Sequence, residues 1–194
     1  NPLPDASITA AGPFCIDAGI QTLIPKTNTG GQFTGGTYIQ SNGDFDPNTA
    51  GVGLHKVYYT FRDINGCINT DSIQILINPL PDASITSAGP FCLDAGFQTI
   101  KAKTNAGGKF YGGSYIDSAG NFNPLNAAIG NNTIHYIFTD TKGCVNSDNI
   151  TVTVNPLPDA SIINAGPFCI DAGTQIIMAN NMKKKKQQHR AELT

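Results

Sequence analysis

The sequence lacks tryptophan, holds only two methionines, and carries charged residues at only 13% of its 194 positions. No run of about 18 apolar residues is present, so we expect no membrane insertion. Glycine is abundant, with 21 residues, but does not recur at every third position, which excludes a collagen helix. A net charge of −2 provides none of the basic surface that nucleic-acid binding requires, so no nucleic-acid partner is expected.

The charges that are present divide the chain into a body and a tail. Up to Met182 the sequence has seven basic residues, thirteen Asp and no Glu, whereas Lys183–Thr194 has five basic residues and one Glu. A body rich in Thr, Asn and Gly with few lysines is typical of secreted β proteins. The basic tail, which begins at about residue 183, belongs to a different compositional class, and four lysines near a chain end are usually a solvated segment.

An internal repeat of 77 residues organises the body. The octapeptide Asn1–Ile8 returns at Asn78–Ile85 and again, with Asn-Pro-Leu-Pro-Asp-Ala-Ser-Ile unchanged, at Asn155–Ile162. Copies 1–77 and 78–154 match at about 43 of 77 positions without insertion or deletion. We therefore predict two complete domains, 1–77 and 78–154, followed by a truncated third copy, 155–194, because 77 residues suit a small domain with its own core.

Each copy has the pattern of an all-β domain. Ile150, Val152 and Val154 alternate with polar residues, as does the equivalent segment 72–77, which indicates strands with one buried face. Segments 57–61 and 134–138 precede them across turns at Asn65-Gly66 and Lys142-Gly143 that favour tight hairpins. Further short strands are expected around Phe33, at Tyr38-Ile39 and at Tyr115-Ile116. About seven short strands per copy predict tandem immunoglobulin-like β-sandwich domains in a rod.

The cysteines recur with the same spacing in both complete copies. Cys15 lies 52 positions before Cys67, and Cys92 lies 52 positions before Cys144. One pair per copy predicts the disulfides Cys15–Cys67 and Cys92–Cys144, and hence an oxidising, extracellular location. Cys169 corresponds to Cys15 and is expected to be unpaired, since its partner would lie beyond the truncation. The alternative is five reduced structural thiols in a cytosolic protein. A zinc site is less favoured still, because the sequence has no CxxC pair and its histidines lack ligand spacing.

The connections between copies are short and rich in proline. Pro79 and Pro81 follow the last predicted strand of the first copy, and Pro156 and Pro158 repeat this arrangement after the second. Two prolines in four residues favour extended backbone and exclude helix, so we expect stiff linkers. Protection of an edge strand is a second role that the same prolines can fill.

The residues indicate no catalytic site, cofactor or metal. His55 is replaced by Asn132 in the second copy, and His135 stands where the first copy has Tyr58, so no histidine recurs at an equivalent site. Asp44-Phe45-Asp46 could suggest a calcium loop, but its counterpart Asn121-Phe122-Asn123 has lost both carboxylates, which favours a turn role. Asp17, Asp94 and Asp171 recur in Cys-Ile/Leu-Asp-Ala-Gly, where we also expect a turn. The chain is therefore predicted not to be an enzyme.

In combination, these motifs resemble a known family. The order Gly-Pro-Phe-Cys, Gly-Gly-x-Phe-x-Gly-Gly, Gly-Asp/Asn-Phe-Asp/Asn-Pro and Tyr-x-Phe-x-Asp-x-x-Gly-Cys, followed by an alternating strand, is similar to the tandem Ig-like (HYR/PKD-like) repeats of Bacteroidota surface proteins. The resemblance covers about 180 residues and extends to gliding-motility-type adhesins exported by type IX secretion. It implies a bacterial cell-surface location and a role as stalk or filament. Because no signal peptide precedes Asn1, we expect a mature or excerpted piece of a longer protein.

Two functions of different classes follow from the sequence. The first is a structural stalk or filament whose partners are other repeats of the same protein or other copies of the chain. The alternative is a module in which the repeats themselves bind surface glycans or proteins. A binding site in every repeat should keep its exposed aromatics, but Tyr58 and Tyr111 are replaced by His135 and Thr34 at the equivalent positions, which favours the first. The leading strands of the third copy could also pair with the sheet edge of another chain.

Overall fold

The computed structural model describes residues 2–163 and 166–179, and its first two 77-residue copies have nearly the same elements. The first copy contains β1 (Phe14–Cys15), β2 (Gln21–Thr22), β3 (Gln32–Thr34), β4 (Asp44–Phe45), α1 (Pro47–Ala50), β5 (Gly53–Arg62) and β6 (Ile68–Asn78). The second contains β7 (Phe91–Cys92), β8 (Gln98–Thr99), β9 (Lys109–Tyr111), β10 (Asn121–Phe122), η1 (Pro124–Asn126), β11 (Gly130–Thr139) and β12 (Val145–Asn155). The basic tail from residue 183 lies outside the described residues.

Each copy is built on one long antiparallel hairpin. In the first, β5 and β6 pair along ten positions, β3 adds to the free edge of β5, and β1 adds in parallel to the far edge of β6, which gives the order β1-β6-β5-β3. Strands β2 and β4 form a second, two-stranded sheet. The second copy repeats this as β7-β12-β11-β9 and β10-β8. The predicted all-β class with tandem β-sandwiches is thereby confirmed.

The inward faces of these strands make a separate core in each copy. Val57 and Tyr59 on β5 and Ile75 and Ile77 on β6 are all at most 1% exposed, as alternation predicts. They pack with buried residues from the second sheet and the loops, and every buried member of this cluster lies within residues 6–77. The second cluster lies within residues 83–154. Because the two clusters share no residue, the copies have independent hydrophobic cores.

The structure has six strands per copy rather than about seven. The predicted strand at Tyr38-Ile39 is wrong, because these residues form a turn with one isolated bridge, Ile39 to Phe45, and the second copy has the corresponding bridge from Ile116 to Phe122. Tyr38 packs edge-on against Phe45 at a centroid distance of 5.6 Å. The apolar pair Tyr38-Ile39 therefore reflects packing of an aromatic ring in a turn rather than a strand.

A short helix in each copy was missed by the sequence analysis. The side chain of Asp46 accepts a hydrogen bond from the backbone N–H of Asn48 at 3.0 Å and so caps α1, whose first residue is Pro47. Asn123 caps the 3₁₀ turn η1 in the same way, through Leu125. The turn role expected for these Asp and Asn residues is confirmed, and one carboxylate or amide oxygen is sufficient for it.

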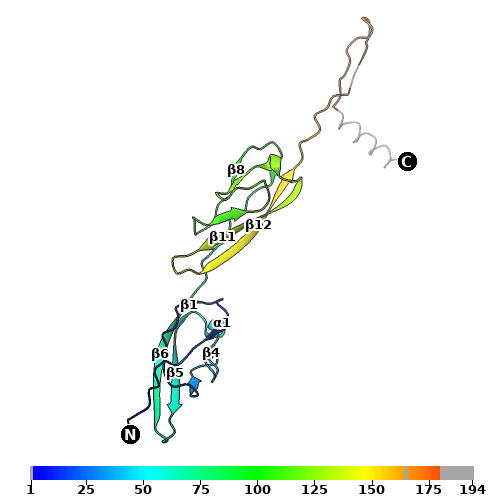
Figure 1. Ribbon diagram of the computed structural model, residues 1–194. Helices are drawn as coiled ribbons and strands as arrows, with labels where there is room; N and C mark the ends of the chain where they lie inside the picture. The colour runs from blue at the N-terminus through cyan, green and yellow to red at the C-terminus, as the bar shows by residue number, and fades with distance from the viewer. Residues whose placement is uncertain (1, 164–165, 180–194) are drawn as a thin grey trace, which may run out of the picture.

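The two copies lie end to end and form an elongated molecule (Figure 1). The tip of the β5–β6 hairpin lies at the same end as the N-terminus, and β1 lies at the opposite end, next to the second copy. The described part of the third copy continues beyond β12. Within the described residues, no helix is long and apolar enough to cross a membrane.

Candidate functional site

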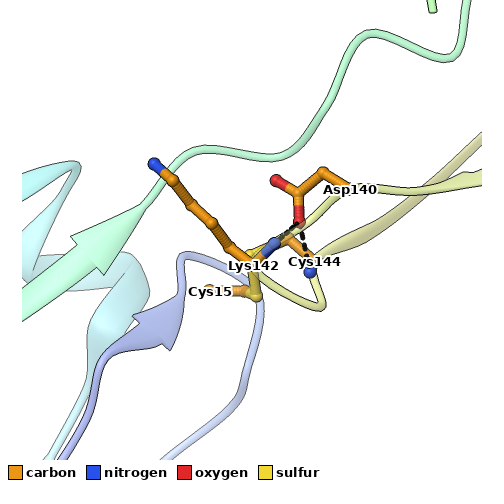
Figure 2. The surroundings of a disulfide bond; sticks show 4 residues. All are labelled: Cys15, Asp140, Lys142 and Cys144. Carbon is orange, nitrogen blue, oxygen red and sulfur yellow. Dashed lines mark hydrogen bonds between the residues drawn. A yellow bond between two sulfur atoms is a disulfide. The ribbon is translucent and has the colours of Figure 1, made fainter.

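The feature that distinguishes this molecule is the joint between its two complete copies, where a disulfide joins Cys15 to Cys144 with a Cα–Cα distance of 5.6 Å. Figure 2 shows Cys15 at the end of β1 and Cys144 in the turn of the β11–β12 hairpin. The bond connects residues 129 positions apart and links one copy to the next. A disulfide of this kind is typical of an extracellular protein.

This pairing corrects the predicted disulfides Cys15–Cys67 and Cys92–Cys144. Cys15 pairs in register with Asn78 at the last position of β6, whereas Cys67 immediately precedes the first position of that strand. The 11 residues of β6 span about 35 Å, and a disulfide requires Cα atoms within about 7 Å. The two cysteines of one copy therefore lie at opposite ends, and Cys15 bonds instead to Cys144 on the hairpin of the next copy. Cys67, Cys92 and Cys169 are free cysteines.

The hairpin turn that carries Cys144 is held by one carboxylate. Asp140 accepts hydrogen bonds from the backbone N–H groups of Lys142 and Cys144, both at 2.9 Å (Figure 2). The backbone adds two more, from Asp140 N to Cys144 O and from Gly143 N to Asp140 O. Gly143 has a φ of 85°, a conformation that glycine adopts without strain. The sulfur is thus presented on a preformed turn.

The opposite side of the joint is built on β1. Its parallel pairing with β6 continues through the hydrogen bond from Ile16 N to Asn78 O at 3.0 Å. Ala18 N donates to Cys15 O at 3.0 Å, which closes the turn expected at Asp17; Cys92 and Cys169 begin the same turn. Asn78 is only 3% exposed, although it is polar and ends its strand. Both contact faces of the joint therefore consist of backbone that is already ordered within each copy.

The proline linker gives the joint little slack. Asn78 is the last residue of β6, and Pro81 already belongs to the second copy, because the Asn146 side chain donates a hydrogen bond to Pro81 O at 2.7 Å. Only Pro79 and Leu80 lie between these anchors. The first copy holds Pro4 with Asn69 through the same bond, at 2.7 Å, so this anchor is a property of the repeat. The joint therefore has two covalent connections, a short proline linker and a disulfide.

The linker is fixed further by Asp82. Its carboxylate accepts hydrogen bonds from the Thr104 hydroxyl at 2.7 Å and the Ser84 backbone N–H at 2.9 Å. Its backbone carbonyl accepts from the Asn105 side chain at 2.8 Å. The Thr104 hydroxyl, followed by Ser84, lowers the pKa of Asp82 from 3.8 to about 2. The second copy thus holds both the linker and the segment that follows it.

The lowered pKa of Asp82 predicts an acid-dependent loss of stability in the second copy. A carboxyl whose pKa is lower in the folded than in the unfolded state stabilises the fold above about pH 4, and this contribution is lost as the pH falls toward about 2. We expect the thermal unfolding midpoint of the second copy to fall as the pH is lowered from about 4 to about 2. The decrease should be smaller in Asp82→Asn, which has no carboxyl at this position. The measurement is the unfolding midpoint against pH. Asp5→Asn is the matched control, and it should change only the first copy, where Thr27 and Ser7 lower the pKa of Asp5.

The Asp140 turn predicts a second measurable effect. In Asp140→Ala the two N–H groups lose their acceptor, which costs about 1–2 kcal/mol of turn stability and reduces the equilibrium constant for closing Cys15–Cys144 by about five- to thirtyfold. The measurement is the fraction of molecules that contain the Cys15–Cys144 disulfide, determined by mass spectrometry at a fixed ratio of reduced to oxidised glutathione. Asp63→Ala is the control, because Asp63 accepts the same bond from Cys67 N at 2.8 Å, but at a free cysteine. An equal loss in both variants would contradict the role of the turn.

The other sequence-derived candidates are dispersed. His55 contacts Gly51 O at 2.8 Å, and its counterpart Asn132 donates to Ala128 O at the same distance, so both have a structural role. His135 stacks on Tyr111 at 4.9 Å. Among residues 2–163 and 166–179, no group of three or more His, Cys, Asp or Glu side chains could hold a metal ion.

One cavity of about 360 Å³ lies in the second copy, where its lining includes Thr99, Lys101, Ser118 and Tyr136. Tyr136 uses its hydroxyl within the fold, since it donates to Asn105 O at 2.6 Å and accepts from Gly108 N at 2.8 Å. The first copy has Ile24 where the second has Lys101. Of the four, Lys101 alone is specific to the second copy, because Thr22, Ser41 and Tyr59 stand at the positions equivalent to Thr99, Ser118 and Tyr136.

Comparisons with known proteins do not assign a family. No family model and no curated protein matches the sequence. Among solved structures, the fold is similar to the protocadherin gamma B4 extracellular domain, with 16% identity, a TM-score of 0.26, and coverage of 69% of this chain and 28% of that one. It is also similar to protocadherin gamma B2 extracellular cadherin domains 3–6, with 14% identity, a TM-score of 0.27, and coverage of 76% and 44%. The chain thus spans less than half of these two proteins, and the function proposed below rests on the joint.

Proposed function

We propose that this chain is a structural stalk or filament-forming repeat region of a bacterial cell-surface adhesin, which holds functional parts of a longer protein at a distance. The observation that carries the proposal is the joint with two covalent connections. A single linker leaves two domains free to pivot, whereas a second connection at Cys15–Cys144 removes most of that freedom. The repeat boundaries at 77/78 and 154/155 are part of the proposal, and the disulfide joint lies at the first of them.

The position of the disulfide fits a stalk better than a binding module. A bond within each repeat would stabilise the repeat itself. The bond observed here spans two repeats whose cores share no residue, so its main effect falls on their relative orientation. Fixed orientation is what a spacer needs, since each flexible joint would shorten its mean end-to-end distance.

The experiment compares the shape of the oxidised wild-type chain with that of Cys15→Ser/Cys144→Ser. Spin labels at Thr49, an exposed residue of α1, and at Ser118, in an exposed turn of the second copy, report the distance between copies by pulsed electron paramagnetic resonance. We expect one narrow distance distribution in the wild type and a clearly broader one in the double variant. Cys67→Ser/Cys92→Ser/Cys169→Ser, which removes the three free cysteines, is the background for labelling in both cases. Equally broad distributions would show that the disulfide does not stiffen the joint, and the stalk proposal would lose its main support.

The alternative is that the repeats bind glycans or proteins, and one observation favours it. The cavity bordered by Thr99, Lys101 and Ser118 has polar groups and an opening in the second copy. A glycan array probed with the full chain tests this. Reproducible micromolar binding that is lost in Lys101→Ile, which restores the first-copy residue, would favour the binding module over the stalk.

A further inference from the structure

The two free cysteines of the complete copies occupy the positions of the bonded pair. Cys67 is the first-copy equivalent of Cys144, and Cys92 is the second-copy equivalent of Cys15. Each repeat therefore carries one cysteine at the tip of its hairpin and one at its opposite end. At the joint, the hairpin cysteine of the second copy bonds to the opposite-end cysteine of the first. The remaining hairpin cysteine, Cys67, and the remaining opposite-end cysteine, Cys92, are free.

The end of the second copy that carries Cys92 has the backbone of a finished joint face. Strand β7 pairs in parallel with β12, with Cys92 opposite Asn155, and Leu93 N donates to Asn155 O at 3.0 Å. These are the contacts that Cys15 and Ile16 make with Asn78. Ala95 N donates to Cys92 O at 3.1 Å and completes the same turn. Cys92 thus has the same backbone contacts in the second copy that Cys15 has in the first.

The hairpin tip of the first copy has the backbone of the complementary face. Cys67 N donates to Asp63 Oδ1 at 2.8 Å, and Asp63 N donates to Cys67 O at 2.9 Å, as Asp140 and Cys144 do at the joint. Gly66 N donates to Asp63 O at 3.0 Å, and Gly66 has a φ of 86°. Both faces are therefore preformed before they meet.

Burial shows which residues a joint covers. Cys144 is fully buried whereas Cys67 is half-buried, and Cys15 is half-buried whereas Cys92 is exposed. Asn78 is 3% exposed at the joint, while its equivalent Asn155 is exposed. The surfaces around Cys67 and Cys92 are thus exposed, whereas the equivalent surfaces around Cys144 and Cys15 are covered by the neighbouring repeat.

We propose that the Cys92 face of one molecule binds the Cys67 hairpin of another molecule of the same chain. A Cys92–Cys67 disulfide between the two molecules then reproduces the Cys15–Cys144 joint. Cys67 lies at the hairpin tip of the first repeat, next to the N-terminus, whereas Cys92 lies beside Asn155 at the opposite end of the two repeats, so a bond between them joins two molecules. The contact is head to tail. Each added molecule leaves one free face at each end of the assembly, so the assembly is an open polymer.

Cys92 is a better partner than Cys169 for this hairpin. Cys169 is also exposed and has the equivalent sequence context, and Ala172 N donates to Cys169 O as in the other copies. The difference lies in its surroundings. Phe168 next to it is 51% exposed, whereas Phe14 and Phe91 are each half-buried in a strand paired with β6 or β12. Cys92 ends the strand β7, whereas Cys169 lies in no strand within residues 166–179.

The bond requires an oxidant, and a small-molecule disulfide such as oxidised glutathione can supply it. The Cys67 thiolate attacks one sulfur of glutathione disulfide and releases one glutathione thiolate. The Cys92 thiolate of another molecule of the chain then attacks the Cys67 sulfur of the mixed disulfide and releases the second glutathione. Two protein thiols become one disulfide, their two protons pass to solvent and the released glutathione thiolates, and one glutathione disulfide is reduced to two glutathione molecules.

The test uses the full chain in a reduced and oxidised glutathione buffer, analysed by non-reducing electrophoresis and by mass spectrometry of cross-linked peptides. We expect a ladder of disulfide-linked oligomers with a Cys67–Cys92 peptide. Cys67→Ser alone and Cys92→Ser alone should remain monomeric, and an equimolar mixture of the two should stop at dimers. Cys169→Ser is the matched control, and its ladder should equal that of the wild type.

Three results would overturn the inference. They are symmetric dimers in either single variant, a ladder that survives in Cys92→Ser, and a dimer fraction in the mixture no higher than in the single variants. The inference rests on the joint of the proposed function, but the two can fail separately. Mass spectrometry that finds Cys15–Cys144 but no Cys67–Cys92 refutes the assembly alone, whereas absence of Cys15–Cys144 removes the basis of both.

Discussion

Pulled from its two ends, the oxidised chain is expected to lengthen by about 450 Å less than Cys15→Ser/Cys144→Ser. Tension that enters at the N-terminus reaches Cys15, crosses the disulfide to Cys144 and continues toward the C-terminus. The segment between the two cysteines is therefore excluded from the extended chain even when the repeats unfold. A separation of 129 residues at about 3.5 Å per residue gives the expected difference.

Single-molecule stretching measures this difference as released contour length. Adding a reductant to the wild type should give the length of the double variant, because it opens the same bond. Cys67→Ser should leave the wild-type value unchanged, since Cys67 is free. Equal extension of the oxidised wild type and the double variant would contradict both the Cys15–Cys144 pairing and the protection of the stalk against stretching.

Tyr59→Ala is expected to destabilise the first repeat by about 3–5 kcal/mol. Tyr59 is 1% exposed, and its ring packs against Phe33 at a centroid distance of 4.6 Å. Its hydroxyl donates to Asn28 O and accepts from Gly31 N, both at 2.7 Å, so it joins β5 to the loop before β3. Tyr59→Phe keeps the ring and loses only these two bonds, for which about 1–2 kcal/mol is expected.

The effect should be confined to one repeat. Because the two cores share no residue, Tyr59→Ala should lower the unfolding midpoint of the first repeat and leave hydrogen-exchange protection of β11 and β12 near its wild-type value. Tyr136→Ala is the matched variant in the second repeat, where Phe110 lies at 4.5 Å, and it should give the reverse pattern. A single cooperative transition that moves equally in both variants would show that the repeats do not unfold independently.

Local patterns were sufficient to predict the main elements of each repeat. Alternating apolar residues at 72–77 and 150–154 lie in β6 and β12, and the turns at Asn65-Gly66 and Lys142-Gly143 join these strands to β5 and β11. Both signals are contained in a few adjacent residues, because side-chain direction in a strand and the φ of a turn depend on the immediate chain. The short helix α1 was missed because four residues are too few to show a helical period.

The joint could not be predicted in the same way. Since every repeat has one cysteine at each end, pairing within a repeat and pairing between neighbours produce the same 77-residue recurrence in the sequence. The anchor of the linker likewise depends on Asn146, which is 65 positions from Pro81. Spacing along the chain contains no information on which ends meet in space.

The sequence by itself therefore determined the repeat, its all-β character and the presence of cysteines and prolines where repeats meet. Only the tertiary structure decided which sulfur atoms pair. The reason is the length of one strand: β6 places Cys67 and Cys15 about 35 Å apart at its two ends, while the short linker brings the hairpin of the next repeat, with Cys144, to Cys15.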